Sequence, residues 1–326
     1  MIEILLKEWI EQVKYYIHLI ADYSIKESQV GAVLDDVLNL SGKMLRSKLL
    51  LLCAFLGSNW KDNKEKICKL AAMVELTHLA SLIHDDIVDD SPYRRGKVSV
   101  QGKYGKDAAV FAGDFLIARI FYYGAVENLN EAVSILSKTV EYMCIGEIEQ
   151  DLCRYQEDIS EKKYFENIER KTAALFQAAS YIGAKEAGCS EKIIQKLGLF
   201  VKNLGLMFQL KDDILDFTSN SKELGKETHK DFQNGIYTFP VIMALKNLKA
   251  KEVLLPIMRK NKEEKLSLAE ILQLQNYIIQ FGGIEASYEK IKYLSNINRQ
   301  LIKELGQNSK ITVYLEKILN DLEVKK

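Results

Sequence analysis

The chain has 326 residues, of which 48% are apolar and 28% charged, a balance that excludes a wholly disordered protein. Its 45 Lys and Arg balance 45 Asp and Glu, so the overall charge gives no indication of binding to nucleic acid or to an anionic membrane. Only 3 Pro and 18 Gly are present, too few for the many short turns of an all-β barrel or sandwich. Any anion binding must therefore come from local groups of basic residues.

The sequence gives no sign of secretion or of a membrane span. The five cysteines are odd in number and include no C-x-x-C pair, which argues against a disulfide framework or a zinc site and favours a reducing cytoplasm. The first residues lack the basic start and the apolar run of a signal peptide. The longest apolar run, residues 49–56, is well short of the roughly 20 residues of a membrane span. We therefore expect a cytoplasmic protein without a transmembrane segment.

Apolar residues recur with helical period along nearly the whole chain, and no window shows the sustained alternation of a strand. Gly, Ser, Asn and Pro interrupt this period and predict helices of roughly 15 to 30 residues. The interruptions fall at residues 57–59, 91–92, 127–130, 188–190, 219–221, 282–283 and 306–309. The pattern predicts one all-α domain over residues 1–326, a single large helical bundle.

The first candidate anion-binding residues precede the apolar run 49–56. Lys43 and Arg46 follow Gly42 at a predicted helix start, where backbone N–H groups also favour anions. By itself this signal is weak.

The strongest motif has the form D-D-x-x-D. It occurs as Asp85, Asp86 and Asp89, and again as Asp212, Asp213 and Asp216. Residues four apart on a helix share a face, so each copy presents a pair of carboxylates that repel each other. A hard cation such as Mg²⁺, completed by water and phosphate, would relieve this repulsion. Both copies end apolar stretches, where unpaired charge is costly, and this favours metal sites over acidic helix ends facing water.

Further polar residues accompany the first motif. Arg94 and Arg95 follow it, and arginine suits bidentate binding of phosphate oxygens. His78 lies seven residues before Asp85, on roughly the same helix face, although a lone histidine in an apolar helix is more often a core residue. Together, acidic and basic groups around an apolar interior predict a polyphosphate ester with an apolar tail, bound through Mg²⁺.

Lys171 and Thr172 interrupt an otherwise helical stretch. A threonine hydroxyl can bond back to a carbonyl of the preceding turn and bend the helix. By themselves, the two residues more often indicate an ordinary polar turn than such a bend.

Two later helices have clear signals. Ser267 and Glu270 predict a capping box at the start of a helix with Ile271, Leu274 and Ile278 on one face. Near the end of the chain, apolar residues at positions 311, 314, 315, 318, 319 and 322 form the stripe of an amphipathic helix.

The order of these motifs resembles that of the trans-polyprenyl diphosphate synthases, and looks most like the catalytic subunit of the bacterial hexaprenyl and heptaprenyl diphosphate synthases. The resemblance covers residues 41–240 and rests on G-K-x-x-R, H-x6-D-D-x-x-D with R-R-G, K-T, F-Q-x-x-D-D-x-x-D and G-K, in that order. It implies a bundle of the isoprenoid synthase type with a central apolar cavity. It also implies ionisation of an allylic diphosphate, attack by the double bond of isopentenyl diphosphate and loss of a proton.

The resemblance assigns roles by motif. The six aspartates would bind three Mg²⁺ ions, and the catalytic group would also include Lys171 and Thr172, where a bend in the helix would turn a freed carbonyl toward the cation. Isopentenyl diphosphate would be held by Gly42, Lys43, Arg46, His78 and Arg95, and the allylic diphosphate by Arg94, Lys171, Thr172, Gln209 and Lys226. Short-chain relatives carry a bulky aromatic residue beneath the first motif. Its absence at Val74, Thr77, Ala80 and Ser81 implies a product of about C30 to C35.

Four positions depart from the family pattern: Ser41 where Gly is usual, Met44 where Arg is usual, Ser47 where Pro is usual, and Ile236 where Lys often stands. These changes predict weaker substrate binding. The resemblance implies a homodimer, with a small non-catalytic subunit as the alternative. Three other functions stay open: a shorter-chain synthase, a non-catalytic scaffold of the same fold, and a metal-dependent phosphohydrolase built on His84 and Asp85.

Overall fold

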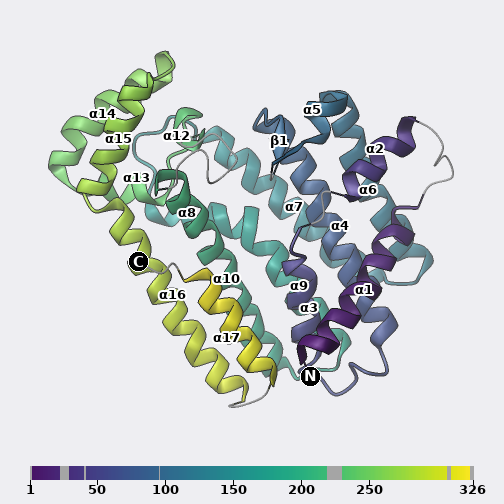
Figure 1. Cartoon of the computed structure of the whole chain (residues 1–326). Helices are drawn as coiled ribbons and strands as arrows, with labels where there is room; N and C mark the ends of the chain where they lie inside the picture. Colours follow the sequence, from purple (N-terminus) through teal and green to yellow (C-terminus); the bar gives the residue numbers. More distant parts are fainter. Residues whose placement is uncertain are drawn as a thin grey trace. The chain divides into compact units, whose positions relative to one another are not determined.

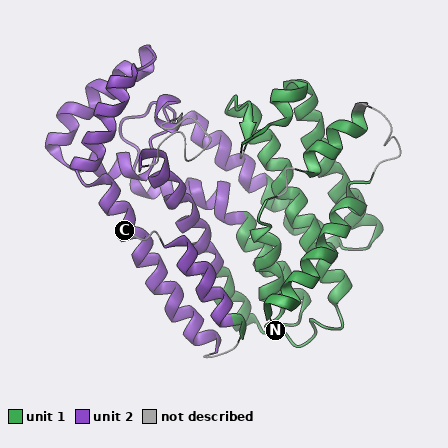
Figure 2. Cartoon of the chain, in the orientation of Figure 1, with its two compact units in different colours: residues 1–140, 175–199, 308–311 green, residues 141–174, 200–307, 312–326 purple. Residues whose placement is uncertain are grey.

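The computed structural model describes residues 2–22, 29–39, 42–94, 96–218, 230–306 and 310–323. Most of these residues are helical, and the strands among them form only one two-stranded hairpin (Figure 1). The prediction of an all-α fold is therefore confirmed. The chain divides into two compact units, each made of separate segments (Figure 2). Unit 1 contains Met1–Val140, Leu175–Leu199 and Asn308–Ile311; unit 2 contains Glu141–Ala174, Phe200–Gln307 and Thr312–Lys326.

Unit 1 is arranged around one central helix. Its helices are α1 (Ile2–Ile20), α2 (Gln29–Leu38), α3 (Leu45–Ala54), α4 (Lys64–Val88), α5 (Val100–Tyr104), α6 (Lys106–Val126), the first part of α7 (Asn130–Leu152), nearly all of α9 (Ala174–Glu186) and the start of α10 (Glu191–Thr218). The central helix α4 packs against α1, α3 and α6. It is buried on nearly every side, so its apolar residues lie all around the helix and not in a one-sided stripe.

A short hairpin follows α4. Its strands, β1 (Tyr93–Arg94) and β2 (Lys97–Val98), pair antiparallel with Tyr93 opposite Val98. Gly96, in the connecting turn, has a φ of +77°, which glycine adopts without steric cost. The sequence did not predict these strands because two residues are too few to show alternation.

Unit 2 holds the remaining elements. They are the end of α7, α8 (Glu161–Ile168), the π-helix η1 (Glu169–Ala173), most of α10, α12 (Lys230–Gln233), α13 (Phe239–Ala244), α14 (Leu248–Glu263), α15 (Leu268–Gln280), α16 (Gly283–Leu305) and α17 (Lys310–Leu322), of which the last begins in unit 1. The predicted capping box is present, with Ser267 and Glu270 bonded reciprocally at the start of α15. Helix α13 packs against α15 and α16, and the predicted stripe of α17 is largely buried.

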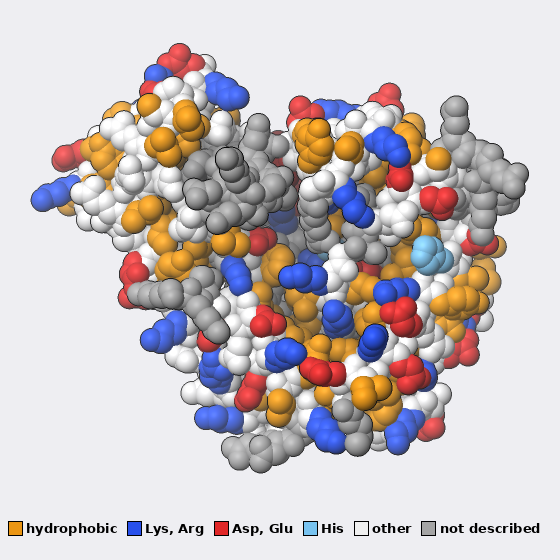
Figure 3. All heavy atoms as spheres, viewed as in Figure 1, with side chains coloured by type: hydrophobic (Ala, Val, Ile, Leu, Met, Phe, Trp, Pro, Cys, Tyr) orange, Lys and Arg blue, Asp and Glu red, His pale blue; other side chains and the backbone are white. Residues whose placement is uncertain are grey.

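Two described helices, α4 and α6, are long and apolar enough to cross a membrane by length and composition alone. Neither contains an uninterrupted apolar run of that length, because charged residues divide both helices. The most apolar window of α4 is 72% buried, as in the core helix of a globular unit, whereas that of α6 is only 39% buried. Helix α6 therefore has an exposed apolar face. Elsewhere, acidic and basic side chains are interspersed with apolar ones on the face shown in Figure 3.

Candidate active site

The first aspartate motif lies at the C-terminal end of α4, in unit 1. Asp85 is half-buried and Asp89, which caps the helix, is exposed, whereas Asp86 is only 3% exposed. Successive residues of an α-helix are rotated by about 100°, so the three carboxylates cannot share one face. The motif thus divides into a more accessible pair, Asp85 and Asp89, and an inward carboxylate, Asp86.

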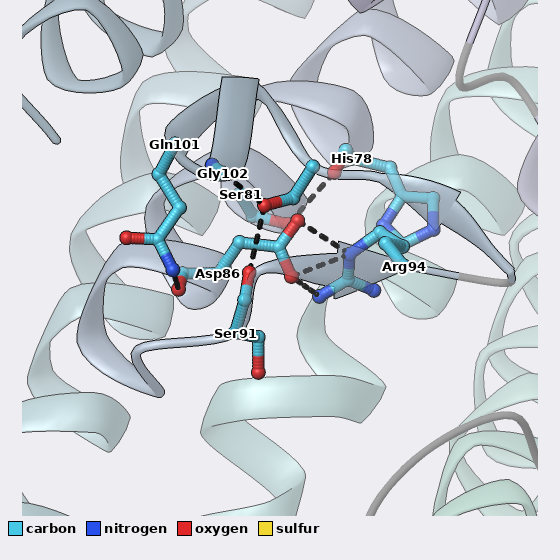
Figure 4. A network of polar contacts seen from close by, with 8 residues as sticks. His78, Ser81, Asp86, Ser91, Arg94, Gln101 and Gly102 are labelled. Atoms are coloured by element: carbon cyan, nitrogen blue, oxygen red, sulfur yellow. Dashed lines mark hydrogen bonds and ion pairs between the residues drawn. The ribbon is translucent and has the colours of Figure 1, made fainter. Parts of the chain in front are cut away.

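The inward carboxylate is held by an arginine of the hairpin. Arg94 Nε lies 2.8 Å from both carboxylate oxygens of Asp86, and Arg94 Nη2 lies 2.8 Å from Oδ1 (Figure 4). The Asp86 carbonyl accepts from Gln101 Nε2 at 2.8 Å and from the Ser91 N–H at 2.9 Å. The carboxylate and the backbone carbonyl of Asp86 are therefore both held by hydrogen bonds. The structure gives Arg94 a role in holding the motif, and its role in binding the allylic diphosphate stays a prediction.

The predicted isopentenyl diphosphate residues lie around the start of α3 and on α4. Gly42 and Lys43 are exposed, and Arg46 is half-buried with its guanidinium 4.6 Å from the centre of the Phe176 ring. Met44 is buried and has a φ of +51°, a left-handed conformation that is costly for a side chain of this kind.

His78 is half-buried on α4, which packs against α3. Two predicted diphosphate ligands, Arg95 and Lys226, lie outside the described residues.

The second aspartate motif, in α10 of unit 2, divides in the same way. Asp212 is exposed and Asp216 half-buried, whereas Asp213 is 1% exposed. Asp213 Oδ2 accepts from the Tyr164 hydroxyl at 2.5 Å, and Oδ1 accepts from Gln209 Nε2 at 3.0 Å. Burial raises the pKa of Asp213 to about 7, and these two hydrogen bonds oppose that rise. Burial and the charge of Asp213 raise the pKa of Tyr164, so its hydroxyl stays a donor.

The predicted helix irregularity at Lys171 and Thr172 is confirmed in place, but its predicted cause is wrong. Residues Glu169–Ala173 form a π-helix, in which an extra residue per turn breaks the α-helical hydrogen bonding. The Thr172 hydroxyl does not bond back to a carbonyl; it donates to Gln209 Oε1 at 3.0 Å. Lys171 Nζ lies 2.9 Å from Glu147 Oε1.

Two glycines let neighbouring helices approach the π-helix. A Cβ at Gly146 of α7 would lie 2.9 Å from the Lys171 nitrogen, and a Cβ at Gly205 of α10 would lie 2.8 Å from the Ala173 Cα. Any larger residue at either position would displace the backbone of the π-helix.

Comparison with known proteins identifies the chain's family. The family described as polyprenyl synthetase matches residues 27–275. The chain belongs to this family. Component 2 of the heptaprenyl diphosphate synthase of Geobacillus stearothermophilus is 34% identical over 265 residues, 80% of each chain. A short chain isoprenyl diphosphate synthase of Methanocaldococcus jannaschii is 36% identical over 263 residues, 77% of this chain and 78% of that protein.

The fold agrees with this assignment. A polyprenyl synthase of Caulobacter crescentus, solved with calcium and isoprenyl diphosphate, superposes with a TM-score of 0.87 at 29% identity over 98% of this chain and 96% of that one. The protein is therefore a polyprenyl synthetase family enzyme, a prenyltransferase with the isoprenoid synthase fold.

The donor set of this prenyltransferase fits Mg²⁺. Each accessible aspartate pair offers carboxylate oxygens one helical turn apart, the ligands that this hard cation prefers. Among the described residues, no three acidic, His or Cys side chains converge on one point. Each pair would thus need water or substrate phosphate to complete the coordination, as is usual for Mg²⁺.

The predicted chain-length residues of the synthase differ in accessibility. Val74, Thr77 and Ala80 are buried at 0%, 2% and 0% exposure, whereas Ser81 is half-buried. The Thr77 hydroxyl donates to the Met73 carbonyl at 2.9 Å. Among the four, Ser81 is thus the position where a larger side chain meets the least packed surroundings.

The dyad suggested by the phosphohydrolase hypothesis is not arranged as a metal site. His84 Nε2 lies 3.4 Å from Asp114 Oδ1 and 3.4 Å from the Val110 carbonyl, both on α6. A Cβ at Gly113 would lie 2.3 Å from the same nitrogen, so the ring packs closely on α6. His84 is therefore directed to a neighbouring helix, which argues against a shared metal with Asp85.

Proposed function

We propose that the protein is a Mg²⁺-dependent synthase that condenses isopentenyl diphosphate with an allylic diphosphate to a product of about C30 to C35. The observation that supports this most directly is the repeated arrangement of the two aspartate motifs. In each, a pair whose members are exposed or half-buried is accompanied by a buried, hydrogen-bonded carboxylate. Structural acidic residues at a helix end have no need of such an arrangement, and it occurs twice.

The pairs Asp85–Asp89 and Asp212–Asp216 would hold Mg²⁺, which supplies positive charge for the leaving diphosphate when bound. Lys43, Arg46 and His78 bind isopentenyl diphosphate and orient its double bond. Lys171, at the π-helix, binds the allylic diphosphate. The apolar residues of α4 exclude water, so that the allylic cation reacts with the double bond and not with solvent. The proton lost afterwards goes to the departing diphosphate.

Product length is proposed from the small residues beneath the first motif. Ala80 and Ser81 offer no aromatic floor to a growing tail. The relatives include both a heptaprenyl and a short-chain synthase, so a shorter product is the alternative.

We further propose a homodimer formed through α6, in the cytoplasm. Phe111, Tyr122 and Val126 are 71%, 62% and 58% exposed on this helix, an unusual exposure for large apolar side chains. A second copy of the chain, with the same apolar face, would cover them. The alternative is a second subunit, and the relative from Geobacillus stearothermophilus is itself named a component.

The experiment is substitution of one accessible aspartate in each motif. Asp85→Ala or Asp212→Ala should lower turnover about 10²- to 10³-fold, because each removes an oxygen that stabilises developing charge. The helical circular dichroism should persist. Asp321→Ala on α17, an exposed aspartate outside the motifs, is the control. Near wild-type turnover in either motif variant would refute the assignment.

A further inference from the structure

Tyr164 belongs to none of the motifs found in the sequence, yet its hydroxyl meets the second of them. It lies in α8, is 7% exposed, and donates to Asp213 Oδ2 at 2.5 Å. Its ring packs against Phe165 and Phe239, with centroids 5.2 Å and 5.5 Å away. Because these rings fix the phenol, its hydroxyl cannot easily move to another hydrogen-bond acceptor.

Asp213 also receives a directed chain of hydrogen bonds from the π-helix. The Thr172 hydroxyl donates to Gln209 Oε1, and the Gln209 amide nitrogen donates to Asp213 Oδ1, each at 3.0 Å. One donor therefore reaches each carboxylate oxygen of Asp213. Gln209 accepts one of these hydrogen bonds and donates the other, so the orientation of its amide is fixed. Hydrogen bonds linked in this way strengthen one another.

These contacts act near the end of a helix. Asp213 lies in the last two turns of α10, which ends at Thr218, and the turns at a helix end fray readily. The nearby pair Asp212 and Asp216 adds repulsion between like charges one turn apart, which disfavours the helix further. The hydrogen bonds at Asp213 anchor the buried face of α10, which opposes both the fraying and the repulsion. They also set the direction of the more accessible face, which carries Asp212 and Asp216.

We propose that Tyr164 is a positioning residue of the synthase, which holds Asp213 and thereby orients Asp212 and Asp216 toward the metal and diphosphate. The inference rests on the proposed function. Tyr164 acts through Asp213, and Asp213 serves as an anchor of the motif. Residues that orient metal ligands in this way are as much a part of a site as the ligands themselves.

The test is Tyr164→Phe, which removes the hydroxyl and keeps the ring. Mn²⁺ binding is measured by electron paramagnetic resonance with farnesyl thiodiphosphate present, an allylic analogue that ionises slowly. The Mn²⁺ dissociation constant should rise about 10- to 100-fold, the usual effect of losing a residue that orients metal ligands. The Mg²⁺ concentration for half-maximal turnover should rise likewise, and saturating Mg²⁺ should restore most of the turnover.

Tyr277→Phe is the matched control, because it removes a phenol hydroxyl that accepts from Gln273 Nε2 at 2.9 Å elsewhere in unit 2. It should bind Mn²⁺ like the wild type. If Tyr164→Phe does not fold, Thr172→Val removes the far donor of the same chain and should weaken Mn²⁺ binding in the same direction.

Unchanged Mn²⁺ affinity in Tyr164→Phe would overturn the inference and leave the proposed function standing. A loss of turnover that saturating Mg²⁺ does not restore would overturn it too. Failure of the proposed function looks different: the wild type itself would neither bind Mn²⁺ with the analogue nor form product.

Discussion

The hydroxyl oxygen of Ser47 lies 2.9 Å from a carboxylate oxygen of Glu75, and both side chains are buried in unit 1. The Ser47 N–H points to the same oxygen at 3.4 Å, and the hydroxyl is 3.0 Å from the Ala71 carbonyl. These contacts join the first turn of α3 to α4, directly after Lys43 and Arg46. Proline, the residue that the family resemblance leads us to expect here, has neither donor. Serine thus anchors by hydrogen bonds a segment that proline would stiffen.

Replacement of this serine should destabilise unit 1. Ser47→Ala leaves the buried Glu75 carboxylate without its hydroxyl donor, which should lower the free energy of unfolding by about 1–3 kcal/mol. Urea denaturation, monitored by circular dichroism, measures this free energy of unfolding. Ser58→Ala, at an exposed position, should change the same quantity by less than about 0.5 kcal/mol. Equal midpoints for the two variants would show that the contact contributes nothing.

The sequence predicted best those elements whose signals are local. The capping box at Ser267 and the one-sided stripes of α15 and α17 depend on neighbours three or four residues away, and all three are present. The irregularity at Lys171 and Thr172 was also located correctly, since two polar residues interrupt an apolar period there.

The contacts that hold the two aspartate motifs could not be predicted from local sequence signals. Tyr164 and Asp213 are 49 residues apart, and nothing local connects a tyrosine of one helix with an aspartate of another. The inward direction of Asp86 and Asp213 did have a local signal, because adjacent residues of a helix cannot share a face. Their partners became known only from the structure.

The ion pair of Arg94 and Asp86 should show strong coupling. Loss of one partner leaves a buried charge without compensation, so Arg94→Ala should cost about 3–5 kcal/mol of stability. A cycle of Arg94→Ala, Asp86→Ala and the double variant should give a coupling energy of about 0.5–3 kcal/mol in urea denaturation. Strictly additive effects would mean that the pair does not fix the end of α4.

Product length should respond to Ser81. Ser81→Phe should shift products toward farnesyl and geranylgeranyl length, because a ring there would block the tail. Ser81→Ala should keep the wild-type product. Ala80→Phe is a poorer probe, since overpacking a fully buried site costs about 1–3 kcal/mol. Thin-layer chromatography of the radiolabelled products measures the distribution of product lengths. An unchanged distribution in Ser81→Phe would show that the growing tail does not pass this residue.

The oligomeric state should depend on the exposed face of α6. Phe111→Asp would place a charge on the proposed dimer contact and should reduce the mass in light scattering from dimer to monomer. Leu248→Asp replaces an equally exposed leucine on α14 and should stay dimeric. A Phe111→Asp variant that remains a dimer would exclude α6 as the interface.

The central claim is tested most directly by turnover of the purified single chain with farnesyl diphosphate, radiolabelled isopentenyl diphosphate and Mg²⁺. We expect product of hexaprenyl to heptaprenyl length, no product in the presence of EDTA, and recovery when Mg²⁺ is returned. Absence of product from the chain alone at any Mg²⁺ concentration would contradict the account; rescue by a cell extract would then indicate an obligate second subunit.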